Sequence, residues 1–249
     1  YFWIGSVISG VLLGLNPPGF GTHWLGLISF LPLVFTLEQF HGIKDLSFRK
    51  RALMYFGICW LSGAIAASIG GYWITNSIHV FGHVPWFAAL ILTGIGYGLE
   101  VGFQLFIYFG IPLLVIRKLN NWDLPLRLAF VLALDPWYPR LIHWNYGALT
   151  FSEFPLLEQL ADIIGSSGLI LYSAGLAFLL LGWWRWKTSR QMQLKTLLKA
   201  TTIYLLLWVL GLSYGAWRLY NLETQDLEPN PQSSYLTVLV IQPNFSLQD

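Results

Sequence analysis

The residue in this chain best suited to chemistry at membrane depth is Glu100, which lies in the run from Gly94 to Gly102. A carboxylate inside an apolar span is costly and is a candidate functional group. Gly94, Gly98 and Gly102 recur every four residues and predict a face on which another helix packs closely, and Glu100 lies off that face. Two interpretations stay open: a neutral, hydrogen-bonded structural residue, which we favour, and an ionised group serving a substrate path.

Other reactive groups are few. His79 and His83 have the spacing of a helical metal pair, but Gly82 and Pro85 predict a poor helix there, and no third ligand is near in the sequence. The single cysteine, Cys59, lies in an apolar stretch and is expected to be a packing residue and not a nucleophile. Neither a Ser, His and Asp arrangement nor an HExxH motif occurs. We therefore expect no catalytic residue, metal site or cofactor within this chain.

Two segments between the apolar stretches, residues 70–85 and 135–146, are aromatic and almost uncharged. We expect both to be outward-facing loops in the outer headgroup layer. They could form the aromatic belt that many membrane proteins show, which we favour. Alternatively, they could line an entrance through which lipid acyl chains leave the bilayer. The second interpretation makes lipid-entry candidates of Tyr72, Trp73, His79, Phe81, Trp86, Trp137 and Tyr138.

The elements that must position these groups are membrane helices. The chain is 55% hydrophobic and only 10% charged, with a mean hydropathy of +0.58, which indicates an integral membrane protein. Its net charge of +2 gives no basis for nucleic-acid binding. We expect a membrane domain over residues 1–220 with about seven spans. Their approximate ranges are up to 15, 24–37, 52–69, 86–116, 124–134, 163–184 and 197–219.

The basic residues predict the orientation of these spans. Twelve of them fall in alternate loops, which the positive-inside rule makes cytoplasmic, and only Arg140 and Arg218 fall on the other side. Because every Lys and Arg then lies in a loop or near a span end, we expect no further buried charge and no cationic partner for Glu100. The twelve are Lys44, Arg49, Lys50, Arg51, Arg117, Lys118, Arg127, Arg185, Lys187, Arg190, Lys195 and Lys199.

The tail differs in kind from the rest of the chain. Residues 235–244 are apolar on both faces, as in a β-strand covered on both sides, and a lone strand cannot bury either face. We therefore expect its partner strands beyond Asp249. Residues 221–249 would be an acidic, turn-rich linker and the truncated start of a second, extracytoplasmic domain. At the other end, the short first stretch predicts a truncated span and not a cleaved signal.

Four stretches, taken in order, resemble apolipoprotein N-acyltransferases. They run from Asn16 to Phe20 with residues 25–32, from Gly71 to Pro85, from Pro155 to Gly168, and from Val238 to Gln242 with Asn244. The chain departs from the family at Asp135–Pro139 and Trp144–Gly147, where many members have an acidic-to-arginine pair and a Gly-Phe-Pro-Trp segment. Glu100 has no obvious counterpart in the family.

The resemblance implies an all-α multi-pass membrane protein that ends in the first β-strand of an α/β nitrilase-like domain. It implies transfer of an acyl chain from a phospholipid to the terminal amine of diacylglyceryl-cysteine lipoproteins, at the outer face of the bacterial inner membrane. The family's Glu, Lys and Cys triad belongs to the nitrilase-like domain, so these 249 residues alone are expected to be inactive. The implied partners are the phospholipid donor, the lipoprotein acceptor and the bilayer, and we expect a monomer.

Two other classes of function stay open. A transporter or channel is favoured by Glu100 and by the interrupted fifth span, but the expected lack of further buried charges and of an internal repeat counts against it. The other class is a membrane anchor or scaffold whose soluble domain binds partners without catalysis. The sequence beyond Asp249 would discriminate between these classes.

Overall fold

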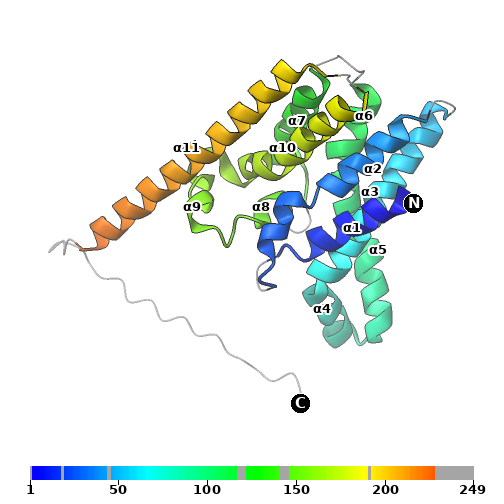
Figure 1. The fold of residues 1–249 in the computed structure, drawn as a ribbon. Helices are drawn as coiled ribbons and strands as arrows, with labels where there is room; N and C mark the ends of the chain where they lie inside the picture. Colours follow the sequence, from blue (N-terminus) through cyan, green and yellow to red (C-terminus); the bar gives the residue numbers. More distant parts are fainter. Residues whose placement is uncertain are drawn as a thin grey trace.

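The computed structural model describes residues 2–17, 20–43, 46–116, 122–140, 146–189 and 192–227, and the regular elements within these ranges are all helical (Figure 1). Four helical segments are long and apolar enough to cross a membrane. They are α3 (Phe48–Gly70), α5 (Trp86–Leu105) continued by η2 (Phe106–Gly110) and α6 (Ile111–Val115), α10 (Ala161–Ser189), and α11 (Leu194–Leu227). The expected all-helical membrane domain is therefore confirmed in its class.

Seven spans are not confirmed, because three of the predicted ones contain only short helices. The first is α1 (Phe2–Gly14), the second is divided into η1 (His23–Ile28) and α2 (Leu31–His41), and the fifth is α7 (Asp123–Leu134). A helix of 12 residues extends only about 18 Å, against about 30 Å of bilayer hydrocarbon. The predicted strand at 235–244 lies outside the described residues. The predicted linker begins as helix, since α11 continues to Leu227.

Glycines bring α1, α3 and α5 into close contact. A methyl group on Gly98 would lie 2.6 Å from Cα of Ala64, and one on Gly63 would lie 2.3 Å from the backbone nitrogen of Gly102. A methyl group on Gly10 of α1 would likewise lie 2.6 Å from a carbonyl oxygen of α3. The predicted small-residue face of Gly94, Gly98 and Gly102 is thus a contact surface between helices. Cys59 is fully buried beside them, as expected of a packing residue.

The segment predicted as the first aromatic loop is in fact helical. It forms α4 (Tyr72–Gly82), which ends at His83 in a left-handed conformation with φ of 50°. Gly82 is the last helical residue and Pro85 lies beyond the end, so neither interrupts the helix, and the expectation of a poor helix was wrong. His83 has left the helix, so the two histidines do not form an i, i+4 pair on one face. His79 Nδ1 lies 2.7 Å from the carbonyl oxygen of Val84.

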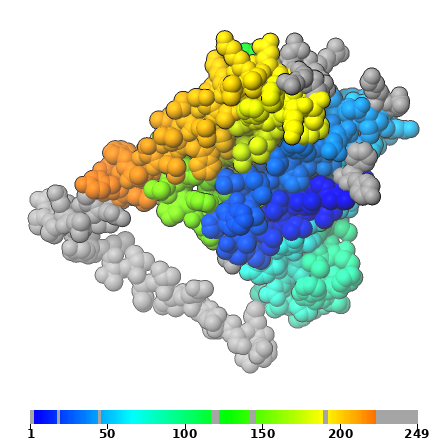
Figure 2. Space-filling model, in the orientation of Figure 1, coloured from blue at the N-terminus to red at the C-terminus, as the bar shows by residue number. Residues whose placement is uncertain are grey.

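Three short elements, η3 (Asp135–Trp137), α8 (Tyr146–Leu149) and α9 (Pro155–Glu158), lie between α7 and α10 in the chain. α10 is bent at Gly165, whose φ of 65° and ψ of 174° strongly favour glycine. α9 packs directly on α11, where a methyl group on Gly215 would lie 1.7 Å from the carbonyl oxygen of Leu156. In Figure 2 the tip formed by α4 and α5 projects at the bottom of the view, and the far end of α11 projects to the left.

Candidate functional site

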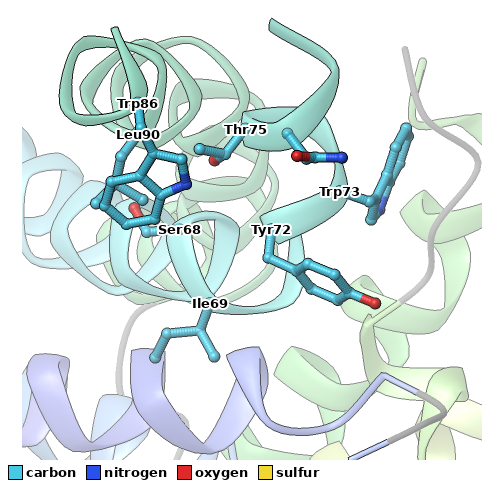
Figure 3. A pocket seen from close by; sticks show the side chains of 8 residues that line it. Ser68, Ile69, Tyr72, Trp73, Thr75, Trp86 and Leu90 are labelled. Atoms are coloured by element: carbon cyan, nitrogen blue, oxygen red, sulfur yellow. The ribbon is translucent and has the colours of Figure 1, made fainter. Parts of the chain in front are cut away.

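A pocket of about 600 Å³ opens where α3, α4 and α5 meet (Figure 3). This volume is within the usual range for small-molecule sites. The helical conformation of residues 72–82 brings Tyr72 and Trp73 to the same cavity as Trp86 at the start of α5. Three of the seven lipid-entry candidates therefore lie together. The lining residues are Ser68, Ile69, Tyr72, Trp73, Thr75, Asn76, Trp86 and Leu90.

The hydroxyl groups of Ser68, Thr75 and Thr93 in this region are bonded within the protein. The Thr75 hydroxyl donates to the Thr93 hydroxyl at 2.9 Å, and Thr93 donates in turn to the Ala89 carbonyl oxygen at 3.0 Å. The Ser68 hydroxyl donates to the Ala64 carbonyl oxygen at 2.8 Å. Since these hydrogens are already used, the pocket offers mainly aromatic and aliphatic surface, which suits an apolar ligand.

The other four lipid-entry candidates lie elsewhere. His79 and Phe81 lie further along α4 and do not line the pocket, and Phe81 is 69% exposed. Trp137 is 84% exposed on η3. The Tyr138 hydroxyl donates to the backbone carbonyl oxygen of Glu100 at 2.9 Å. The candidates thus divide between the pocket, the end of α4 and the segment after α7, and a role for any of them in lipid entry stays a prediction.

Glu100 is half-buried on α5, off the glycine face as predicted, and it lies within electrostatic reach of Tyr97, Tyr138 and Tyr146. Burial, reinforced by the Glu100 charge and opposed by Arg140, raises the pKa of Tyr138 to about 12. Tyr138 is therefore a neutral hydrogen-bond donor at physiological pH. The structure surrounds Glu100 with tyrosines, which fits a role in a hydrogen-bonded interior.

A cluster that we call the Asp135 cluster consists of Gln104, Tyr108, Asp135 and Arg140. Asp135 is fully buried and accepts hydrogen bonds from the Tyr108 hydroxyl and the Arg140 guanidinium. The amide of Gln104 donates to the Tyr108 hydroxyl at 2.8 Å. An acidic–arginine pair therefore does form here, between Asp135 and Arg140, although the sequence around Asp135 departs from the family pattern.

A second cluster, the inner ion cluster, consists of Glu38, Asp123, Arg127 and Arg185, which are 8%, 1%, 0% and 4% exposed. Arg185 contacts Asp123 at 2.5 Å and Glu38 at 2.5 Å, while Arg127 contacts Glu38 at 3.1 Å. The expectation of no further buried charge was wrong, and Arg127 and Arg185 are not loop residues. Each lies in a helix, where two carboxylates neutralise two guanidinium groups.

One feature of the sequence indicated the inner ion cluster, although the predicted spans did not take it into account. Asp123 and Arg127 are spaced as an i, i+4 ion pair within an otherwise apolar helix, and their closest atoms are 3.4 Å apart. The partners Glu38 and Arg185 could not be found this way, because they are 147 residues apart in the chain.

The profile of the family described as the apolipoprotein N-acyltransferase N-terminal domain matches residues 9–179. An apolipoprotein N-acyltransferase of Bdellovibrio bacteriovorus is 24% identical over 230 residues, which cover 85% of this chain and 37% of that protein. One of Allorhizobium ampelinum is 28% identical, with 96% of this chain and 43% of that protein covered. One of Borreliella burgdorferi is 28% identical, and the match covers 64% of this chain and 28% of that protein. No solved structure matches the chain significantly.

The chain thus spans less than half the length of these curated relatives. The family match covers most of the chain, from within α1 to within α10, and includes the pocket, the whole Asp135 cluster and all of the inner ion cluster except Arg185. This chain belongs to the apolipoprotein N-acyltransferase N-terminal domain family.

Proposed function

We propose that this chain is the membrane domain of a bacterial apolipoprotein N-acyltransferase. The complete enzyme would transfer an acyl chain from a phospholipid to the terminal amine of a diacylglyceryl-cysteine lipoprotein, at the outer face of the inner membrane. The catalytic Glu, Lys and Cys would lie in a nitrilase-like domain beyond Asp249. Family membership and the names of the relatives support this proposal.

The pocket between α3, α4 and α5 is the observation that supports a role of the membrane domain in binding the donor lipid. Tyr72, Trp73 and Trp86 line it at the tip formed by α4 and α5, for which the basic-residue pattern predicts a position at the outer leaflet. Tyrosine and tryptophan combine a large apolar surface with a polar tip, which suits a site that accepts an acyl chain next to lipid headgroups. We propose that a donor acyl chain enters the enzyme through this pocket.

The segment from Asp135 to Arg140 supplies a second aromatic surface. The hydrogen bond from Tyr108 of η2 to Asp135 and the bond from Tyr138 to the Glu100 backbone fasten this segment to the bundle. Trp137 therefore projects from a fixed backbone while remaining exposed. We propose that Trp137 and Tyr138 contact the donor lipid or the lipoprotein's acyl chains.

The buried charges of the inner ion cluster, which the sequence did not predict, remove one argument against the transporter alternative. The four residues of the inner ion cluster neutralise one another, however, and they link helices instead of leaving one charge available to a passing ion. Membership of an acyltransferase family also favours the enzyme over a transporter or a non-catalytic scaffold.

The function is tested by reconstituting the full-length protein in phospholipid vesicles with a diacylglyceryl-cysteine peptide. Mass spectrometry should show the peptide gaining one acyl chain as an amide. Residues 1–249 alone, reconstituted in the same way, form the matched control and should give no product. Absence of product from folded, full-length protein at varied donor lipids would refute the proposal.

A further inference from the structure

Helix α7 presents one buried stripe to the rest of the bundle. Asp123, Arg127, Val131 and Asp135 recur at intervals of four residues, and each is at most 1% exposed. Residues four apart lie on one face of a helix. The stripe is charged at both ends and apolar in the middle, and it extends about 18 Å.

The two ends of this stripe are held by different parts of the protein. At the inner end, Arg185 of α10 contacts Asp123 at 2.5 Å, and Glu38 of α2 contacts Arg127 at 3.1 Å. At the other end, Asp135 binds Tyr108 of η2 and Arg140. A rotation or sliding of α7 would disturb both sets of contacts together.

The length of α7 explains why such contacts are needed. A helix of 12 residues is shorter than the hydrocarbon core, so bilayer thickness cannot determine its depth. The inner ion cluster is also not fully satisfied: Oδ1 of Asp123 and Nε of Arg127 are buried without a hydrogen-bond partner among the described residues. Because replacing a buried ion pair by apolar residues is often neutral for stability, we attribute to this cluster a role in specifying one arrangement of the helices.

We propose that Asp123 and Arg185 are positioning residues, which act through α7 to fix the depth of Asp135 and so of the attached segment that carries Trp137 and Tyr138. The mechanical coupling stands on the contacts of α7 alone. Its consequence for catalysis rests on the proposed function, in which Trp137 and Tyr138 contact a lipid substrate.

The coupling is tested by placing a nitroxide spin label at Trp137→Cys in the full-length, reconstituted protein and subtracting the spectrum of the equally treated Trp137 parent. Power saturation with oxygen and a nickel chelate then reports the depth of the label. Asp123→Asn should shift the label by on the order of 2 Å or increase its mobility. The matched control is Asp162→Asn, which removes a carboxylate from the half-exposed ion pair of Asp162 with Arg218 and should leave depth and mobility unchanged.

An unchanged label in Asp123→Asn would overturn the proposal. If Asp123→Asn does not accumulate in the membrane, Arg185→Lys replaces it, because lysine keeps the charge but loses the forked contact with Asp123 and Glu38. Arg185→Lys should move the label in the same way. An unmoved label in Arg185→Lys would also overturn the proposal.

The catalytic consequence is tested by a double-mutant cycle on KM for the phospholipid. Asp123→Asn and Tyr138→Phe should each raise KM, roughly tenfold or less, and the combination should raise it no further than Tyr138→Phe alone. If the label moves but KM does not change, the coupling between Asp123 and the depth of the Trp137 segment is supported, and the proposed contact of Tyr138 with the lipid substrate is refuted. Additive effects on KM with an unmoved label would refute the coupling.

Discussion

Asp123 and Asp135 lie at opposite ends of α7, and the carboxylate of each is buried against an arginine from outside that helix. The helix between them is therefore fixed by polar contacts at both ends. We infer that the Asp123–Arg185 ion pair and the hydrogen bond from Tyr108 to Asp135 select a single depth and rotation for α7, the shortest predicted span.

The inner ion cluster should be sensitive to the loss of one member. Arg127→Ala leaves Glu38 and Asp123 buried with one guanidinium fewer, so the free energy of unfolding should fall by about 3–5 kcal/mol. Asp162→Ala, in the half-exposed pair with Arg218, should cost less than about 1 kcal/mol. Denaturant titration in detergent measures both, and equal losses would contradict the difference in burial.

Two glycines of α5 should respond oppositely to alanine. A methyl group on Gly98 would lie 2.6 Å from Cα of Ala64, whereas one on Gly96 would have no neighbour within 4 Å. Gly98→Ala should lower the melting temperature because α3 and α5 must separate. Gly96→Ala should leave the melting temperature unchanged or raise it, because alanine favours the helix over glycine by up to about 1 kcal/mol. Equal melting temperatures for the two variants would show that α3 and α5 do not pack at Gly98.

Glu100→Gln should leave turnover and stability of the full-length enzyme close to normal. Glutamine keeps the shape of the side chain and most of its hydrogen bonding, and the proposed chemistry lies in another domain. Acyl transfer and thermal stability are measured side by side in the same preparation. A large fall in turnover at an unchanged protein level would show instead that the charge serves the substrate path.

Trp73→Ala should slow formation of the acyl-enzyme by roughly tenfold while leaving expression nearly normal. Trp73 lines the pocket and is 41% exposed, so its loss removes a surface for the acyl chain without opening the core. Trp122→Ala, at a residue that is 69% exposed and does not line the pocket, is the control. If Trp73→Ala instead lowers the amount of protein with no kinetic defect, the aromatic belt interpretation is favoured.

The orientation rests on the distribution of basic residues. A reporter fused after Leu219 should report an extracytoplasmic location, and one fused at Lys50 should report a cytoplasmic location. Phosphatase and fluorescent-protein fusions measure the two sides separately. Reversal of either result would refute the orientation and, with it, the placement of the pocket at the outer leaflet.

The sequence by itself determined the features that depend on neighbouring residues. Apolar runs of sufficient length predicted the four long helices, and the spacing of Gly94, Gly98 and Gly102 predicted the face that packs on α3. Both follow from one helix's periodicity and length, so no knowledge of distant residues was needed. The four ordered stretches predicted the family for the same reason, because short motifs are local.

Only the tertiary structure decided which distant side chains meet. The helical course of residues 72–82 placed Tyr72 and Trp73 with Trp86 in one pocket. Similarly, Glu38 and Arg185 pair across 147 residues. A basic residue in an apolar sequence looks like the end of a span, because an unpaired buried charge is too costly. The carboxylate that makes its burial possible is supplied by another helix, and that pairing exists only once the helices pack.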